Sequence, residues 1–379
     1  MMRIPAKRPN ARLRQWLIGT ACIGGAALLV ASQMPRQAIA EPVRLQSEAT
    51  SDSAVWNAVV VHKGSVYLAG PRWAGNTGAA LTRLRRGVPT PYPDRKWNEW
   101  RAGADAARSF VNINALRLGP DGGLWAVDSG SPEFGGGPLP GGAKLVRIDP
   151  QTSRVTRVIG FAPDIARPGS YVDDVRFNGR HAYLTDAGNP GIIVLDLETG
   201  QARRVLDGDR STTARPERAI RVDGATLDGP DGRPLLVHAD PMELTPDRRW
   251  LLFGPLAGPW SRVPTRLLDD PEIAAPELAR AVEPFADLPP TGGTAMDAAG
   301  NLYFSDLSDD AIRVRRPDGR VETLVSDPRL HWVDAMFIDD ADRLWMPAAQ
   351  IDRVPLFQKG VSKLRRPLTI WSVPLEPAS

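Results

Sequence analysis

The stretch Tyr171–Leu206, YVDDVRFNGRHAYLTDAGNPGIIVLDLETGQARRVL, decides the fold of this chain. Turn residues such as Asn178-Gly179 and Glu198-Thr199-Gly200 divide it into short runs rich in β-branched and aromatic residues. The runs cover residues 175–177, 182–185, 191–197 and 202–206. Such runs, separated by Gly, Asn, Asp and Pro, are typical of consecutive β-hairpins. The stretch therefore predicts one four-stranded antiparallel sheet.

The same strand pair recurs along the chain, and two positions mark each copy. The first positions, which we call the first anchors, are Asn57, Asn114, Asp173, Asp240, Gly292 and Asp334. The second anchors are Tyr67, Trp125, Tyr183, Leu251, Tyr303 and Trp345. Successive gaps in the two series agree to about one residue, and the smallest matches the ~40–45 residues of a bare propeller blade. Six such units without helical spacers predict an all-β protein, a six-bladed β-propeller of four-stranded blades.

The last unit needs an outer strand from elsewhere in the chain. Its third strand is expected at Leu368–Val373, after which the chain ends. The segment Val43–Gln46 precedes the first anchor and is the expected donor, since closure by the N-terminal strand removes an exposed sheet edge. Long loops hold much of the remaining sequence, and a short helix is expected at Pro276–Val282.

Composition favours a folded, turn-rich protein. The 379 residues are 42% hydrophobic and include 35 Gly and 36 Pro. The net charge of +3 arises from six basic residues and no acidic residue in the first 40, so 41 basic and 44 acidic residues remain beyond them. A nearly neutral chain lacks the basic surface that nucleic acid requires, so no nucleic-acid partner is expected.

The first 40 residues have the order of a secretory signal peptide. Met1–Arg14 is basic, Trp16–Ala31 is apolar, and Gln37–Ala40 ends in a small-residue pattern, so cleavage is expected after Ala40. Residues 41–379 would then form the propeller, secreted or periplasmic and without a membrane anchor. An uncleaved anchor, or lipoprotein processing at Cys22, the only cysteine, are the alternatives. We expect a monomer.

The first anchors nominate a site, because the first strand of each blade lines the central channel of a propeller. Five of the six carry a side-chain oxygen and three are carboxylates, which repel one another unless protons or a cation neutralise them. Two residues before an anchor, Asn112, Tyr171, His238 and Trp332 lie on the same face and would form a rim suited to a cation. Asp174 should point to the opposite face from Asp173.

These considerations give two overlapping residue sets. The expected ligand-binding residues are Asn57, Asn112, Asn114, Tyr171, Asp173, Asp240, Trp332 and Asp334. The oxygens expected to hold a divalent cation such as Ca²⁺ belong to Asn114, Asp173, Asp240 and Asp334. The alternative is that these side chains only satisfy strand-end amides. Asp128, Asp186 and Asp306, which end second strands, are expected to cap turns. No Gly-x-Ser-x-Gly motif supports a serine hydrolase.

The chain resembles the major royal jelly protein/yellow family. The residues that carry the resemblance are Val172-Asp-Asp-Val, Ala182-Tyr-Leu-Thr-Asp, Asp297-Ala-Ala-Gly-Asn-Leu-Tyr-Phe-Ser-Asp and Trp332-Val-Asp. The resemblance, from about residue 52 to 375, implies secretion and a six-bladed propeller, and bacterial members are often described as dopachrome-tautomerase-related. Asn114-Ala-Leu and Asp334-Ala-Met resemble, more loosely, signatures of the gluconolactonase/regucalcin propellers, whose metal-binding Glu has no match here.

Three functional hypotheses follow. The first is an exported propeller that binds a small cationic or polyhydroxylated molecule in its axial pocket, with dopachrome-tautomerase-like activity implied by the resemblance. The second is a metal-dependent, gluconolactonase-like hydrolase that uses the same oxygens. The third is an interaction scaffold that uses the long loops.

Overall fold

Six four-stranded antiparallel sheets make up nearly all of the regular structure. The computed structural model describes residues 44–375, and the predicted signal peptide lies outside them. Blade 1 consists of β2 (Ala58–His62), β3 (Ser65–Ala69), β4 (Leu81–Arg85) and β5 (Val88–Pro91). Blade 2 consists of β6 (Ile113–Leu118), β7 (Leu124–Asp128), β8 (Lys144–Asp149) and β9 (Arg154–Gly160). Blade 3 consists of β10 (Val172–Asn178), β11 (His181–Asp186), β12 (Gly191–Asp196) and β13 (Ala202–Val205).

The second half of the ring repeats the same meander. Blade 4 consists of β16 (Ala239–Leu244), β17 (Trp250–Pro255), β18 (Trp260–Pro264) and β19 (Glu283–Ala286). Blade 5 consists of β20 (Thr294–Met296), β21 (Leu302–Asp306), β22 (Ala311–Arg315) and β23 (Val321–Ser326). Blade 6 consists of β24 (Phe337–Ile338), β25 (Arg343–Pro347), β26 (Leu368–Pro374) and β1 (Gln46–Ser51). The predicted six-bladed β-propeller is confirmed.

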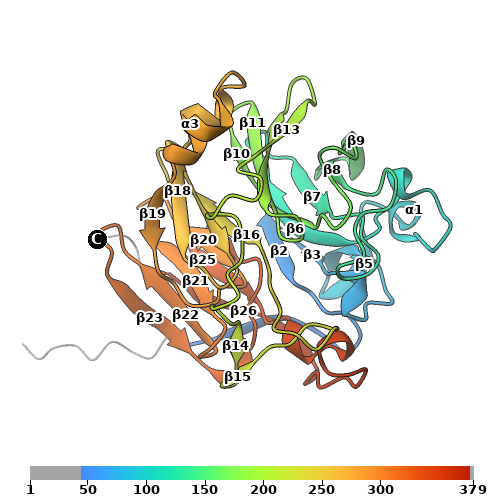
Figure 1. Cartoon of the computed structure of the whole chain (residues 1–379). Helices are drawn as coiled ribbons and strands as arrows, with labels where there is room; N and C mark the ends of the chain where they lie inside the picture. The colour runs from blue at the N-terminus through green and yellow to red at the C-terminus, as the bar shows by residue number, and fades with distance from the viewer. Residues whose placement is uncertain (1–43, 376–379) are drawn as a thin grey trace, which may run out of the picture. The chain divides into compact units, whose positions relative to one another are not determined.

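The first strand of each blade faces the centre of the ring. Contacts run from β2 to β6, β10, β16, β20 and β24, and back to β2. A parallel bridge between Ala58 and Ala335 joins the first and last of these strands. Figure 1 shows the outer strands of the blades arranged around these inner strands. The first anchors therefore surround one axis, as the sequence predicts.

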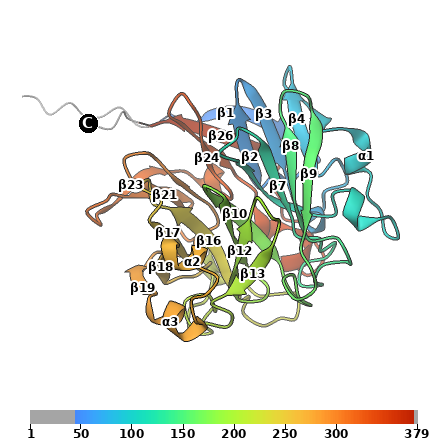
Figure 2. The same ribbon diagram turned by 90° about the horizontal axis from the view of Figure 1, so that it is seen from above.

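The N-terminal strand closes the ring, but from a different segment than predicted. β1 pairs antiparallel with β26, from Gln46 opposite Ser372 to Ser51 opposite Leu368, and the two strands lie side by side in Figure 2. The prediction of Val43–Gln46 is wrong by about four residues, because the donor strand is a polar edge strand without an apolar pattern. Arg343 and Ser372 Oγ both donate to Glu48 Oε1, at 3.2 and 2.5 Å, which fixes the closure.

Side chains between neighbouring blades form the core. Trp125 packs on Phe177 of the next blade with ring centroids 5.5 Å apart, and Tyr183 lies in one apolar cluster with Phe253 of blade 4. Trp345 packs in the same way against Leu68 of blade 1. These second-anchor aromatics therefore pack between neighbouring blades.

Aspartates at the ends of the second strands act as buried latches. Asp128 accepts hydrogen bonds from the backbone N–H groups of Val111 and Asn112 at 2.8 and 2.9 Å and pairs with buried Lys144 at 2.6 Å. Asp186 accepts from the Tyr171 N–H at 2.9 Å. These aspartates do cap turns, through the N–H groups of Gly130 and Asn189, and they also fix the backbone that enters the inner strand of their own blade.

Insertions that follow the second or the fourth strand of a blade lie at one end of the axis. They carry the hairpin β14 (Arg221–Val222) and β15 (Ala225–Thr226) and the 3₁₀ turns η1 (Arg72–Ala74), η2 (Ala106–Arg108), η3 (Pro328–Leu330), η4 (Ile351–Arg353) and η5 (Pro355–Phe357). The helices are α1 (Arg95–Asn98), α2 (Thr265–Asp269) and α3 (Ala275–Arg280), the last confirming the predicted short helix. Within residues 44–375, no helix is long and apolar enough to cross a membrane.

Candidate functional site

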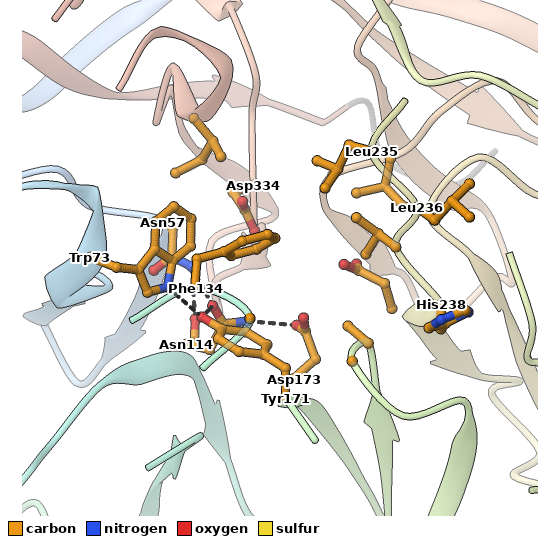
Figure 3. A pocket seen from close by; sticks show the side chains of 18 of the residues that line it. Asn57, Trp73, Asn114, Phe134, Tyr171, Asp173, Leu235, Leu236, His238 and Asp334 are labelled. Carbon is orange, nitrogen blue, oxygen red and sulfur yellow. Dashed lines mark hydrogen bonds between the residues drawn. The ribbon is translucent and has the colours of Figure 1, made fainter. Parts of the chain in front are cut away.

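A cavity of about 320 Å³ lies on the axis, at the end covered by the insertions. Seven of the eight predicted ligand-binding residues line it, namely Asn57, Asn114, Tyr171, Asp173, Asp240, Trp332 and Asp334. Figure 3 shows the labelled members of this set around one space. The structure thus brings these seven side chains together around one cavity. That they bind a ligand stays a prediction.

A chain of hydrogen bonds fixes the polar wall of the cavity. Tyr171 Oη receives hydrogen bonds from Trp73 Nε1 at 2.9 Å and Asn112 Nδ2 at 3.1 Å, and it donates to Asn114 Oδ1 at 2.9 Å. Asn114 Nδ2 in turn donates to Asp173 Oδ1 at 2.6 Å. One carboxylate oxygen at the centre is therefore oriented from side chains two blades away.

Asn112 lies behind this wall and does not line the cavity. Its side chain is fully buried, and its Nδ2 also donates to Ser129 Oγ at 2.9 Å, while its Oδ1 accepts from the Arg72 N–H at 2.6 Å. All of its polar atoms have partners in the protein. The sequence placed it at the rim because of its spacing, but it orients Tyr171 instead.

Asn57 has an unused acceptor beside the cavity. Its Nδ2 donates to Asn114 O at 3.0 Å, whereas its Oδ1 is buried and has no partner among the described residues. A buried polar atom without a partner costs about 1–3 kcal/mol. A ligand that donates a hydrogen bond, or a cation, would satisfy this oxygen.

Burial raises the pKa values of all three axial carboxyl groups. Burial, followed by the charge of Asp334, holds the pKa of Asp173 well above its ordinary value. Burial and then the charge of Asp173 do the same for the pKa of Asp240. Burial raises the pKa of Asp334 to about 7. A cation in the cavity would favour the ionised forms of these groups.

No lysine or arginine offsets these acids among the described residues that line the cavity. His238 is the one basic side chain among these described lining residues, and burial lowers its pKa. Its Nδ1 accepts a hydrogen bond from the Ala214 N–H at 3.0 Å, so the neutral ring carries its proton on Nε2. The site is therefore anionic or neutral, according to pH.

Aromatic rings from three insertions cover the carboxyl groups. Trp73 contacts Phe134 edge-on with centroids 5.0 Å apart, and Phe134 contacts Phe357 at 5.3 Å. Phe134 also lies 6.2 Å from the Tyr171 ring. Figure 3 shows Trp73, Phe134 and Tyr171 together on one side of the cavity. An aromatic wall above carboxylates suits an organic cation.

Sequence reasoning missed most of this cover. The missed lining residues are Trp73, Phe134, Leu235, Leu236, Val237, Leu256, Ile351 and Phe357. Nearly all of them lie in long insertions, where no strand period indicates which way a side chain points. The length of the loops was the only available signal.

Trp332 reaches the cavity with a strained backbone. Its φ is +51°, in the left-handed region that bulky residues avoid, and its side chain is buried. Such strain costs about 1–3 kcal/mol and is found mostly at functional sites. The next-door anchor is Gly292, where a Cβ would lie 2.9 Å from the Val333 carbonyl oxygen and 3.4 Å from Trp332 Nε1. The backbone beside Trp332 therefore approaches too closely for a side chain at position 292.

An ion-pair network closes the axis beneath the carboxyl groups. Asp174 accepts hydrogen bonds from Arg117 at 2.5 Å and from Arg176 at 2.8 Å, and Arg176 also pairs with Glu243 at 2.6 Å. Burial opposes ionisation of Asp174, but the two guanidinium groups outweigh it and lower its pKa. The expectation that Asp174 faces away from the axis is wrong, because β10 has a bulge between Val172 and Val175. Asp174 forms the floor.

The metal prediction meets a geometric difficulty. Carboxylate and amide oxygens are the ligands that Ca²⁺ prefers, so the donor types fit. Within residues 44–375, however, Asp223, Asp310 and His331 are the one trio of acidic or histidine side chains whose ligand atoms all lie within 4.8 Å of one another. The ligand atoms of Asp173, Asp240 and Asp334 do not all lie this close to one another. They would have to move inward to share one ion.

The Asp223–Asp310–His331 trio is better explained as a structural ion pair. Both ring nitrogens of His331 already contact carboxylates, Asp310 at 2.7 Å and Asp352 at 2.9 Å. Burial opposes the charged ring, but these two hydrogen bonds outweigh it and raise the pKa of His331 to about 9. A protonated imidazole has no lone pair for a metal. Through its contact with Asp352, His331 holds η4 and the neighbouring Trp332 in place.

Fold and site together define a class: a six-bladed propeller with an acidic, aromatic-covered axial cavity. The chain belongs to the major royal jelly protein family, whose family model matches residues 119–366. No curated protein matches the chain. The resemblance stated from the sequence motifs is thereby confirmed.

Solved structures show the same fold. A protein assigned to the gluconolactonases matches at 12% identity and a TM-score of 0.52, over 88% of this chain and 92% of its own. The calcium-binding protein regucalcin from Agrobacterium tumefaciens matches at 12% identity and a TM-score of 0.50, over 86% and 93%. A gluconolactonase from Xanthomonas campestris matches at 13% identity and a TM-score of 0.46, over 89% and 99%. At such identities the likeness concerns the fold alone.

Proposed function

We propose that this protein binds a small protonated amine with an apolar, preferably aromatic, body in its axial cavity. The observation that carries the proposal is the set of three carboxyl groups, Asp173, Asp240 and Asp334, facing one cavity with no lysine or arginine among its described lining residues. The ammonium group lies against these carboxylates, and Asn57 Oδ1 accepts one of its hydrogen bonds. The apolar body contacts the aromatic wall by cation–π and dispersion contacts.

A thermal-shift screen tests the proposal with matched ligand pairs. Phenethylamine and tyramine are compared with phenethyl alcohol and 4-(2-hydroxyethyl)phenol, which replace the ammonium group by a neutral hydroxyl. We expect the amines to raise the melting temperature and the alcohols to have little effect. Equal shifts within a pair would refute an electrostatic site.

Matched variants locate the binding in the cavity. Asp173→Asn removes a carboxylate and keeps the volume, and we expect it to weaken amine binding at least tenfold. Asp94→Asn, at the exposed N-cap of α1, is the control and should bind as wild type. Unchanged binding by Asp173→Asn would remove the axial cavity from consideration.

A catalytic form of the same proposal is a dopachrome-tautomerase-like proton shift. The pKa values of Asp173 and Asp240 are both raised, by burial first and then by neighbouring carboxylates, and such a pair can accept a proton from one ligand atom and return it to another. Conversion of dopachrome followed by absorbance, with Asp240→Asn beside wild type, tests this form. Equal rates for wild type and Asp240→Asn would show that this pair of aspartates does not catalyse the reaction.

A divalent cation at the same oxygens is the second candidate, favoured by the buried, unpartnered Asn57 Oδ1 beside Asn114. A lactonase would use such an ion to polarise a substrate carbonyl. Metal analysis of purified protein, together with melting curves in Ca²⁺ and in chelator, distinguishes the two candidates. A stoichiometric ion and a Ca²⁺-dependent melting temperature would favour the hydrolase over the amine binder.

We further propose export, with the mature chain beginning at Glu41. Intact mass measurement of protein recovered from the periplasm or medium tests it. A mass corresponding to the full 379 residues, or to lipid-modified Cys22, would contradict cleavage after Ala40.

A further inference from the structure

A second hollow, of about 650 Å³, lies directly outside the axial cavity. The two share four lining residues, Phe134, Gly135, Leu235 and Leu236. The outer hollow is therefore continuous with the axial cavity through these residues. We call them the gate.

The gate is apolar on both sides. Figure 3 shows Phe134 on one side of the space and Leu235 and Leu236 on the other. Leu236 is 39% exposed, one of few large apolar side chains among residues 44–375 with so much exposure. A chain that passes between Phe134 and Leu236 would remove this surface from water. Burial of apolar surface is favourable at about 25 cal/mol per Å².

The outer hollow is preformed and carries no net charge. Three prolines, Pro216, Pro230 and Pro234, line it. Its tip is a hydrogen-bonded turn, with Gly229 N–H donating to the Arg233 carbonyl at 2.7 Å. The charged lining residues, Asp231 and Arg233, pair with each other at 2.6 Å. The hollow thus offers an uncharged chain a surface that is lined largely by apolar residues and has no net charge.

We propose that the ligand of this site is a long amine in two parts, an ammonium head in the axial cavity and an uncharged, apolar chain that passes the gate into the outer hollow. This inference rests on the proposed amine binding and adds the substrate class. The distribution of charge sets the orientation of the bound amine. All three carboxyl groups lie in the axial cavity, whereas the outer hollow has no net charge.

Calorimetric titration with n-butylamine, n-hexylamine, n-octylamine and n-decylamine, each below its micelle concentration, tests the chain length. We expect affinity to rise roughly two- to fourfold per methylene up to decylamine, as for partial to full burial of each group. Affinity that stops rising after butylamine or hexylamine would overturn the two-part ligand and leave the amine site standing. No binding by any member would refute both.

A variant that fills only the outer hollow separates the two parts. A Cβ at Gly229 would lie 3.3 Å from Asp231 Oδ1 and 3.7 Å from Leu235 Cδ1, so Gly229→Trp projects into the hollow without backbone conflict. We expect it to keep butylamine affinity within twofold and to abolish the gain from octylamine and decylamine. Gly160→Trp, at an open position on β9 with nothing within 4 Å, is the control. Retention of the full chain-length gain by Gly229→Trp would contradict the proposal.

Discussion

At the scale of single residues, the site is organised by unfavourable groups that a ligand would relieve. Asp334 has a pKa of about 7 because burial opposes its charge, Asn57 Oδ1 lacks a partner, and Trp332 has a positive φ. Each of these features lowers the stability of the folded protein. Replacing a residue whose unfavourable state serves function often makes a protein more stable.

The carboxyl pKa gives the first prediction, in which Asp334→Asn stabilises the folded protein at high pH. A folded pKa of about 7 against an ordinary 3.8 means that the folded state binds the proton more tightly. The contribution of Asp334 to the free energy of unfolding therefore falls as pH rises from about 4 to 7, by at most about 4 kcal/mol. Urea unfolding at pH 8 and pH 4 checks this.

We expect Asp334→Asn to be the more stable protein at pH 8 and to differ little from wild type at pH 4. Asp247→Asn, at an exposed turn, is the control, because its carboxylate has a lowered pKa through hydrogen bonds from Thr245 and the Arg249 N–H. A destabilised Asp334→Asn at pH 8 would show that Asp334 is stably ionised in the free protein.

Tyr171→Phe is the second prediction at this scale. It removes the hydroxyl that links Trp73 and Asn112 to Asn114, and it leaves buried polar groups unpaired at about 1–3 kcal/mol each. We expect amine affinity to fall about tenfold while the protein stays folded. Tyr303→Phe, which removes a hydroxyl bonded to Asp297 in blade 5, should leave affinity unchanged; similar losses in both would indicate a general effect on packing.

At the scale of elements, the latch aspartates connect blade structure to the site. Asp186 is fully buried, pairs with Arg204 at 2.7 Å and holds the Tyr171 N–H. The sequence indicated the capping role from position alone. It did not reveal the buried guanidinium, because the partner lies on another strand of the sheet.

Asp186→Ala should destabilise the protein by about 3–5 kcal/mol, since it takes one of two carboxylates from buried Arg204 and leaves the Tyr171 N–H without its acceptor. Asp121→Ala, which breaks the more exposed pair with Arg147, should cost no more than about 1 kcal/mol. Chemical denaturation of both variants measures the difference. Equal effects would mean that the remaining pair with Asp207 is sufficient for the Arg204 charge.

The strand pattern shows what sequence reasoning can and cannot reach. Inner strands were placed to within a few residues because their anchors recur in a fixed register. The insertion residues Phe134 and Leu236, and the bulge that turns Asp174 toward the axis, were missed because loops and bulges break the period that carries the information. The floor and the cover of the site were therefore found in the structure alone.

At the scale of the whole molecule, the ring depends on one short polar strand. β1 covers the edge of β26, and Glu48 ties it to Arg343 and Ser372. An uncovered edge strand is prone to aggregate. Closure by an N-terminal strand was predictable from the missing fourth strand of blade 6, although its position was not, since QSEATS has no apolar alternation.

Comparison of chains that begin at Glu41 and at Asp52 tests the closure. The shorter chain lacks β1, and we expect a lower melting temperature and concentration-dependent aggregation. Adding the peptide of residues 44–51 should restore part of the stability. If the shorter chain melts as the longer one does and stays monomeric, the β1–β26 pairing contributes little.

The central claim, a cation site built from carboxyl groups of raised pKa, is tested most directly by calorimetry of tyramine binding at pH 7 in phosphate and in Tris buffer. Because the ammonium group favours ionised carboxylates, binding should release protons from Asp173, Asp240 and Asp334, and the measured enthalpy should differ between the buffers by their ionisation enthalpies. Affinity should also rise as pH increases from 6 to 8. Binding without proton release and without this pH dependence, or no binding at all, would contradict the account.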